Sequence, residues 1–309
     1  MFGSLYGHAA RAQDFVGTRA LSLGEAYRAT ATGNDAIYFN PAGLNVVPRD
    51  GIELSYRGDL SQKEDHSVDV SVVDSKTSTV AAGVAYTFDG REFTKRASYQ
   101  HKATLALSYP LFPQLLNVGA GLKYVNVSDA ILGNYLNALS ADVGVLSRLP
   151  GGVTLAGVGY NLIPIKSQRV PLSAGFAANV DLGPLSALIF GGGPSLGFKP
   201  NAAGLPIPST LGDLQGPLAG LTLEADWHIN FATLYGAKSR LSAGAEYLFL
   251  DSIPVRAGYL YDELSNDHFV SVGAGFIVPY FGLDVAYQQS VFHNNERVFS
   301  AALKFFLSL

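Results

Sequence analysis

The fold is decided near the end of the chain, where residues 281–288 read FGLDVAYQ and residues 299–307 read FSAALKFFL. In the first stretch, large apolar side chains take every second position, and glycine, aspartate, alanine and glutamine take the positions between them. A period of two places these two sets on opposite faces of a β-strand. One face is suited to hydrocarbon and the other to a polar interior.

The same alternation dominates from Gly51 onward, in segments close to the ~9 to 11 residues of a tilted outer-membrane strand. We expect about fourteen strands from this pattern. They are expected to begin near Gly51, Ser67, Thr77, Lys102, Asn117, Leu139, Gly152, Val170, Ala219, Arg240, Pro254, Asp267, Tyr280 and Arg297.

The composition indicates that much of the surface does not face water. Of 309 residues, 48% are hydrophobic and 15% are charged, whereas a soluble domain is about a quarter charged. No stretch approaches the ~18 to 20 uninterrupted apolar residues of a membrane-spanning helix. Without helices, only a closed barrel pairs every backbone group inside a bilayer. The alternative, a soluble β-sandwich, would carry more outward charge. The sequence therefore predicts an all-β fold, a transmembrane antiparallel β-barrel in the bacterial outer membrane.

The sequence carries few features of enzymes or of nucleic-acid-binding proteins. Cysteine is absent, which excludes disulfides, thiolate nucleophiles and thiolate metal sites. A net charge of −4 gives no basic stripe for a phosphate backbone, so no nucleic-acid partner is expected. The common motifs of hydrolases, zinc proteases and dinucleotide-binding proteins are missing as well. We expect a protein that is not an enzyme and has no cofactor.

The lengths of the links predict a topology, because outer-membrane barrels combine short periplasmic turns with longer outer loops. Short turns near residues 74–76, 148–151, 251–253 and 278–279 all fall on one side if the first strand rises from the periplasm. Longer links, including residues 89–101, fall on the other side. The Gly- and Pro-rich insertion at 181–217 breaks this rule. It is either a periplasmic excursion that docks a partner or a segment that holds an extra strand near residues 185–191.

The first 50 residues do not alternate. Residues 1–12 end in the small-x-small sequence Ala10-Arg11-Ala12, which is typical of an export-signal remnant, although an ordinary flexible tail is the alternative. Residues 13–50 contain helix formers, and Asn34-Asp35 could cap a second short helix that Pro41 and Gly43 would stop. A barrel of about fourteen strands is too wide for its own side chains to fill. We therefore expect 13–50 to be a plug, followed by the barrel at 51–309.

This N-terminal segment resembles a known family. Residues 17–27, GTRALSLGEAY, and residues 34–44, NDAIYFNPAGL, are similar to the signature of the FadL-like outer-membrane proteins, and most of all to the short PorV-type branch. The resemblance implies a fourteen-stranded barrel with an N-terminal plug. The plug motif comprises Gly17, Arg19, Ala20, Gly24, Asn34, Asp35, Asn40, Pro41, Ala42 and Gly43.

The resemblance implies two classes of function. FadL passes long-chain fatty acids and other hydrophobic molecules through its plugged barrel, so a hydrophobic or amphipathic ligand in the lumen is expected. PorV-type proteins serve secretion machines as carriers or shuttles, which implies a periplasmic or outer-membrane protein partner. This second reading describes a non-conducting anchor or shuttle subunit of an envelope secretion or motility machine. In both classes of function, the barrel is expected to be surrounded by outer-membrane lipid.

Charged residues on the predicted strands point to a polar network in the lumen. Glu224, Asp226 and His228 lie at every second position of one strand and so share a face. Metal ligation by these three is conceivable, but successive side chains on one face stand about 7 Å apart, too far to close a shell alone. We expect them to pair with other inward charges or with the plug, for example Arg19 or Glu25, because buried charge needs a partner. The expected network comprises Lys123, Glu224, Asp226, His228, Glu246, Arg256, Asp284 and Lys304.

Overall fold

The computed structural model describes most of the chain. The export-signal prediction at 1–12 and the possible extra strand near 185–191 lie outside the described residues. Among those described, no helix has the length and apolarity needed to cross a membrane. The described residues are 15–60, 65–91, 98–129, 135–163, 171–184, 198–200, 206–208, 220–231, 236–293 and 296–307.

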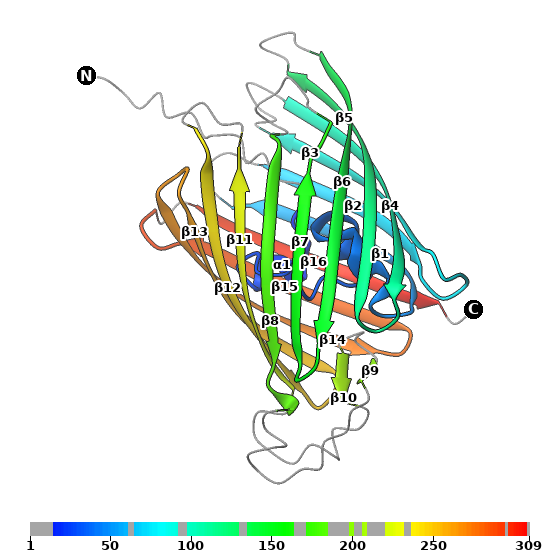
Figure 1. The fold of residues 1–309 in the computed structure, drawn as a ribbon. Helices are drawn as coiled ribbons and strands as arrows, with labels where there is room; N and C mark the ends of the chain where they lie inside the picture. The colour runs from blue at the N-terminus through cyan, green and yellow to red at the C-terminus, as the bar shows by residue number, and fades with distance from the viewer. Residues whose placement is uncertain are drawn as a thin grey trace.

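Fourteen antiparallel strands form a closed barrel (Figure 1). Each strand pairs with its neighbours in the chain, except that β8 pairs with β11 across the insertion. The first and last strands pair over Asp50–Asp59 and close the barrel. The strands are β1 Asp50–Asp59, β2 His66–Asp74, β3 Ala81–Arg91, β4 Ser98–Phe112, β5 Leu116–Asp129, β6 Tyr135–Leu149, β7 Val153–Tyr160, β8 Ser173–Asp181, β11 Leu221–Asn230, β12 Lys238–Phe249, β13 Ile253–Asp262, β14 Asp267–Val278, β15 Phe281–Ser290 and β16 Arg297–Leu307.

The predicted fold class is therefore confirmed, and most strands begin close to where the alternation places them. The third strand begins at Ala81 rather than near Thr77. One reason is local: the Asp74 carboxylate accepts hydrogen bonds from the backbone N–H groups of Lys76 and Thr77, at 3.2 and 3.1 Å. An aspartate that bonds the backbone two residues ahead favours a turn over a ladder. The connection therefore extends to Val80.

Alternation along each strand separates an apolar outside from a polar inside. On β1, Leu54 is 46% exposed while the adjacent Glu53 is 3% exposed. On β15, Val285 is 38% exposed while Asp284 is fully buried. An outward apolar band around a polar lumen is the pattern of a barrel that lies in a membrane.

The barrel has two different ends. At the end we call the short-turn end, strands are joined by turns such as 250–252 and 279–280, and the insertion between β8 and β11 also leaves here. At the other, the long-loop end, β1 ends at Asp59 and β2 begins at His66, and β3 ends at Arg91 and β4 begins at Ser98. Within the described part of the insertion, β9 Phe198–Pro200 and β10 Pro206–Pro208 form a separate two-stranded sheet. Neither joins the barrel (Figure 1).

Residues 15–49, which we call the lumen segment, lie inside the barrel (Figure 1). Their core includes two edge-to-face aromatic pairs, Phe15 with Tyr38 and Tyr27 with Phe39, at centroid distances of 5.5 and 5.7 Å. The segment contains α1 Thr18–Ser22, the 3₁₀ helix η1 Gly33–Asp35, α2 Ala36–Phe39 and the 3₁₀ helix η2 Pro41–Asn45.

The predicted second helix is present as α2, but the predicted side-chain cap is not. Asp35 is the N-cap residue and makes no capping hydrogen bond. Its carboxylate instead lies against the backbone of Gly17, where a Cβ would stand 1.7 Å from Oδ1. The Asn34 amide donates to the Ser71 hydroxyl of β2, at 2.9 Å. Contacts made only in the folded lumen have replaced the local cap.

Candidate functional site

The lumen segment follows the inner wall and contacts every strand of the barrel. Helix α1 packs against β13 to β16, and the Thr18 hydroxyl bonds the Ser300 hydroxyl of β16 at 2.7 Å. The next residues, Leu23 and Gly24, lie against Gly244 of β12 and Gly258 of β13. The first half of the lumen segment therefore covers β12 to β16.

The remaining strands are met by the second half of the segment. Helix η1 packs against β1 and β2, and η2 packs against β3 to β6. The Asn40 amide donates to the Val145 carbonyl of β6 at 3.2 Å, and the Tyr160 hydroxyl of β7 donates to the Phe39 carbonyl. Arg28 lies against Gly175 of β8. With Glu224 and Asp226 of β11, described below, the ring of contacts is complete.

Glycine on the wall allows this close approach. A Cβ added to Gly258 would lie 2.0 Å from the carbonyl carbon of Leu23, and one added to Gly119 would lie 2.3 Å from the backbone nitrogen of Ala42. Both neighbours are backbone atoms, which cannot rotate away. The lumen segment and the wall are thus in direct backbone contact on opposite sides of the barrel.

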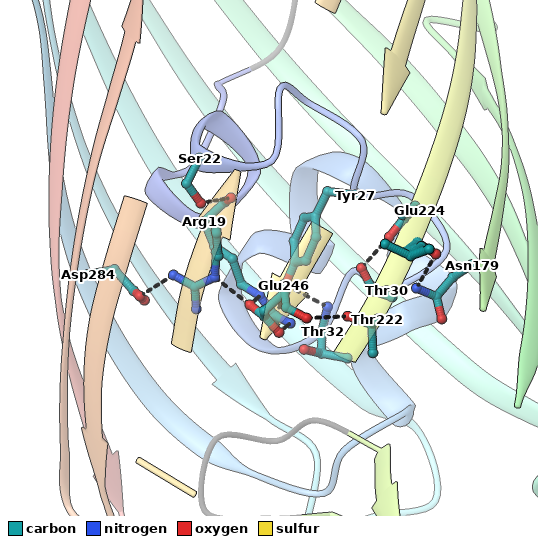
Figure 2. A network of polar contacts seen from close by, with 12 residues as sticks. Arg19, Ser22, Tyr27, Thr30, Thr32, Asn179, Thr222, Glu224, Glu246 and Asp284 are labelled. Carbon is teal, nitrogen blue, oxygen red and sulfur yellow. Dashed lines mark hydrogen bonds and ion pairs between the residues drawn. The ribbon is translucent and has the colours of Figure 1, made fainter. Parts of the chain in front are cut away.

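One ionic cluster fixes α1 to the wall. Arg19 donates to both carboxylate oxygens of Glu246, at 3.0 and 2.8 Å (Figure 2). Glu246 also accepts from Arg256, which reaches Asp284 at 2.6 Å, and Asp284 pairs with Lys304 at 2.9 Å. The chain of charges alternates in sign across β12, β13, β15 and β16. Each charge is therefore compensated where water is scarce.

A second cluster fixes the middle of the lumen segment to β11. Arg28 pairs with Asp226 at 2.5 Å and donates to the Tyr160 hydroxyl at 2.7 Å. Glu224 accepts from the backbone N–H of Ala29 at 2.6 Å and from the Thr30 hydroxyl (Figure 2). Both carboxylates of the predicted Glu-x-Asp-x-His strand are thus engaged by the lumen segment.

The other two predicted network residues, Lys123 and His228, lie beside the second cluster, where the Lys123 ammonium is 5.8 Å from the centre of the Tyr160 ring. Lys123 of β5 pairs with Asp142 of β6 at 2.8 Å, both deeply buried. The His228 ring packs edge-on against the Tyr160 ring, with centroids 5.6 Å apart. Lys123 therefore pairs with a carboxylate of the neighbouring strand β6. Among the described residues, no group of three or more His, Asp or Glu side chains is arranged to hold a metal ion.

The predicted plug motif is buried throughout, and its Asn-Pro step has a clear structural role. The Asn40 carbonyl oxygen Oδ1 accepts from the Ala42 N–H at 3.1 Å, and its amide donates to the Arg28 carbonyl at 3.1 Å. Pro41 begins η2 at a position where a missing N–H costs nothing. Gly43 lies where a Cβ would meet the Ala31 carbonyl oxygen at 2.0 Å. The motif thus joins the two halves of the lumen segment.

Sequence reasoning missed several anchoring residues. Arg28 is buried and central, and Arg240 of β12 pairs with Glu25 at 2.8 Å. Tyr38 donates to Asp69 of β2, a contact that ties α2 to the wall. The sequence signals these residues only weakly. Arg240 is a charge at an inward position of a strand, and Arg28 and Tyr38 are a charge and a hydroxyl within a mostly apolar segment.

The two arginines of the lumen segment remain charged in place. Burial lowers the pKa of Arg19, but the adjacent Glu246 carboxylate outweighs this effect and holds the pKa above its ordinary value. For Arg28 the same opposition arises between burial and the Asp226 carboxylate, and the pKa is again raised. Neutralising either carboxylate would leave a buried cation without compensation.

Geometry and burial together define a class: a closed membrane barrel of fourteen strands whose lumen holds an N-terminal segment fixed by ion pairs. Solved structures of the same fold are known. A FadL homologue of Pseudomonas aeruginosa aligns with 94% of this chain and 98% of its own, at 11% identity and a TM-score of 0.62. The toluene transporter TodX of Pseudomonas putida covers 96% and 98%, at 12% identity and 0.62.

A third structure, the monoaromatic hydrocarbon channel CymD, covers 94% of this chain and 97% of its own, at 13% identity and a TM-score of 0.64. No family model matches the sequence. No curated protein matches it either. The structural likeness shows that the chain has the FadL-type barrel fold.

Proposed function

We propose that this protein lies in the bacterial outer membrane and passes hydrophobic or amphipathic small molecules across it, with the lumen segment acting as a plug. The observation that carries the proposal is the extent of the structural likeness. Structures described as toluene transporters or monoaromatic hydrocarbon channels match nearly the whole chain. The outward apolar band, in which Leu54 and Val84 are 46% and 56% exposed, supports a membrane location.

The lumen supports a plug that has to move. Contact with every strand leaves the lumen segment in the path of any solute. Its anchors are ion pairs and hydrogen bonds to the wall, such as Arg19 with Glu246 and Arg28 with Asp226. These directional contacts can be exchanged one by one for contacts in another position, while the apolar contacts with the wall, such as those of Val73 and Ala85, would have to separate when the segment moves.

Two measurements test the proposal. Deletion of residues 13–47 should leave an inserted, heat-modifiable barrel that conducts ions in planar bilayers, because the segment fills the lumen. Cells that lack their own hydrophobic-compound channels should take up radiolabelled toluene or oleate faster when they express the full chain. Unchanged conductance after the deletion would refute the plug, and unchanged uptake of both compounds would refute transport.

A second candidate is a PorV-like anchor or shuttle subunit that conducts nothing. The observation in its favour is the insertion at the short-turn end, where β9 and β10 form a sheet of their own outside the barrel. A connection of this length in a compact fold is usually either functional or disordered. Replacing 181–217 by a Gly-Asn turn should then preserve heat-modifiable folding and abolish co-purification of a protein partner. If uptake is lost and no protein co-purifies with the full chain, the anchor reading is wrong.

A further inference from the structure

One arginine on the inner wall of the barrel has no acidic partner in the described part of the chain. Strand β6 reaches the short-turn end (Figure 1), and Arg148 is its penultimate residue. Arg148 faces the lumen, because it lies two positions after Leu146, which is 1% exposed on the inner wall. Its side chain is partly buried, and among the described residues its guanidinium has no ion pair or hydrogen bond.

Other arginines of the inner wall show what Arg148 lacks. Arg240 of β12 pairs with Glu25 of the lumen segment at 2.8 Å, and Arg256 of β13 pairs with Asp284 of β15 at 2.6 Å. A cation that is partly withdrawn from water is costly unless an anion compensates it. The position of Arg148 therefore suits an anion that the described part of the chain does not supply.

Hydrogen-bond donors surround Arg148 on the inner wall. Thr154 of β7 is its direct partner across the sheet. Asn117 of β5 lies opposite Leu146 and is therefore a diagonal neighbour of Arg148. The amide nitrogen Nδ2 of Asn117 is buried and has no hydrogen-bond partner among the described residues. The carboxylate of Asp181, at the short-turn end of β8, instead accepts from a backbone N–H at 2.9 Å.

These groups match an oxyanion. A guanidinium presents five N–H donors in a planar fork, which fits the two oxygens of a carboxylate. The Thr154 hydroxyl and the Asn117 amide can each donate one further hydrogen bond. Charge-assisted hydrogen bonds are roughly twice as strong as those between neutral groups. An organic carboxylate would therefore satisfy the arginine and the buried amide together.

The site lies on the far side of the lumen segment from the long loops. On the same strand, Gly144 marks the level of the segment, because a Cβ there would stand 2.1 Å from the Asn40 side-chain oxygen. Arg148 follows Gly144 by four residues, or about 13 Å along a strand, toward the short-turn end. A solute that enters at the long-loop end therefore reaches Arg148 only after it has passed the lumen segment.

We propose that Arg148, Asn117 and Thr154 form an exit site that binds the carboxylate of an amphipathic solute. The inference rests on the proposed function, transport through the lumen, and adds a class of solute that has a hydrocarbon tail and an anionic head. The lumen segment divides the path, and the site holds the anionic head once the solute has crossed that division. A neutral hydrocarbon has no acceptor for these donors and gains nothing from the site.

Isothermal titration calorimetry of the full chain in detergent tests binding without transport. Octanoate is the probe, octan-1-ol is its neutral counterpart, and inorganic phosphate is the competing oxyanion. We expect Arg148→Gln to weaken octanoate binding by about tenfold or more and to leave octan-1-ol binding unchanged. Thr154→Val and Asn117→Leu should each weaken octanoate binding about fivefold. Ser147→Ala, on the outward face of β6, is the matched control, and heat-modifiable migration checks that each variant folds.

Uptake by cells supplies a second readout, which separates the site from the proposed function. Arg148→Gln should slow the uptake of radiolabelled laurate relative to that of toluene. If the original chain takes up neither compound, the proposed function and the exit role both fall, whereas octanoate binding that depends on Arg148 would still stand. If Arg148→Gln binds octanoate as the original chain does, or if inorganic phosphate binds as tightly as octanoate, the proposed site is wrong.

Discussion

Substitution of Gly258 by alanine tests whether the lumen segment depends on backbone contact with the wall. The added Cβ would lie 2.0 Å from the Leu23 carbonyl carbon and 2.1 Å from the Gly24 nitrogen. Neither atom can rotate away, and Gly24 itself has a φ of +65° that few other residues adopt. The segment must therefore shift. Overpacking of this kind costs about 1–3 kcal/mol.

That cost falls on the closed position of the segment, because the strand itself keeps its ladder. A difference of about 1–3 kcal/mol raises the open fraction about 5-fold to 150-fold. We expect Gly258→Ala to insert normally and to show frequent ion-conducting openings in planar bilayers.

Two glycines of the same wall provide matched controls. A Cβ at Gly282 would meet Lys304 Cβ at 3.4 Å, and one at Gly121 would meet Asp142 Cβ at 3.7 Å. Alanine at either position should leave the ion conductance of the barrel as low as that of the original chain. Equal conductance of Gly258→Ala and Gly282→Ala would refute the argument, since it would mean that the close contact does not hold the segment in place.

Two further predictions concern single charges. Arg28→Met should lower the free energy of unfolding in urea by about 3–5 kcal/mol, because it leaves the Asp226 carboxylate buried without its partner. The double variant Arg28→Met, Asp226→Asn should regain much of this loss, and no recovery would contradict the pairing. At the long-loop end, the hydrogen bond and charge of Asp267 raise the pKa of His293 above its ordinary 6.5. The contact between His293 and Asp267 should protect the 291–296 loop from protease below pH 6.5. This protection should be lost as the pH rises through the raised pKa of His293. An NMR titration in which Asp267→Asn leaves the His293 pKa unchanged would contradict this assignment.

The barrel was predictable from sequence because its main signal is strong and local. A period of two with large apolar residues on one side, as in residues 281–288, specifies both a strand and its outward face. Turn lengths then fix the direction of each strand. Thr77 shows the limit of this reasoning: its turn is extended by the Asp74 carboxylate and by Asn45, which donates to the Thr79 carbonyl at 3.2 Å. A contact from the lumen segment cannot be read from the strand.

The candidate site was predictable only in outline. The inward position of Glu224 and Asp226 follows from alternation, and the need for partners follows from burial. Their partners, Thr30 and Arg28, depend on where the lumen segment turns, which no spacing encodes. The grouping of Arg148 with Asn117 was invisible for a similar reason. These two residues become neighbours only once the register between β5 and β6 is known.

The circular course of the lumen segment also has a consequence for biogenesis. The segment bridges the seam where the first and last strands meet, through Thr18 with Ser300 of β16 on one side and Asn34 with Ser71 of β2 on the other. It precedes the barrel in the chain, yet its binding surface exists only when all the strands are assembled. The segment can therefore make all of its contacts only once the seam between the first and last strands is closed.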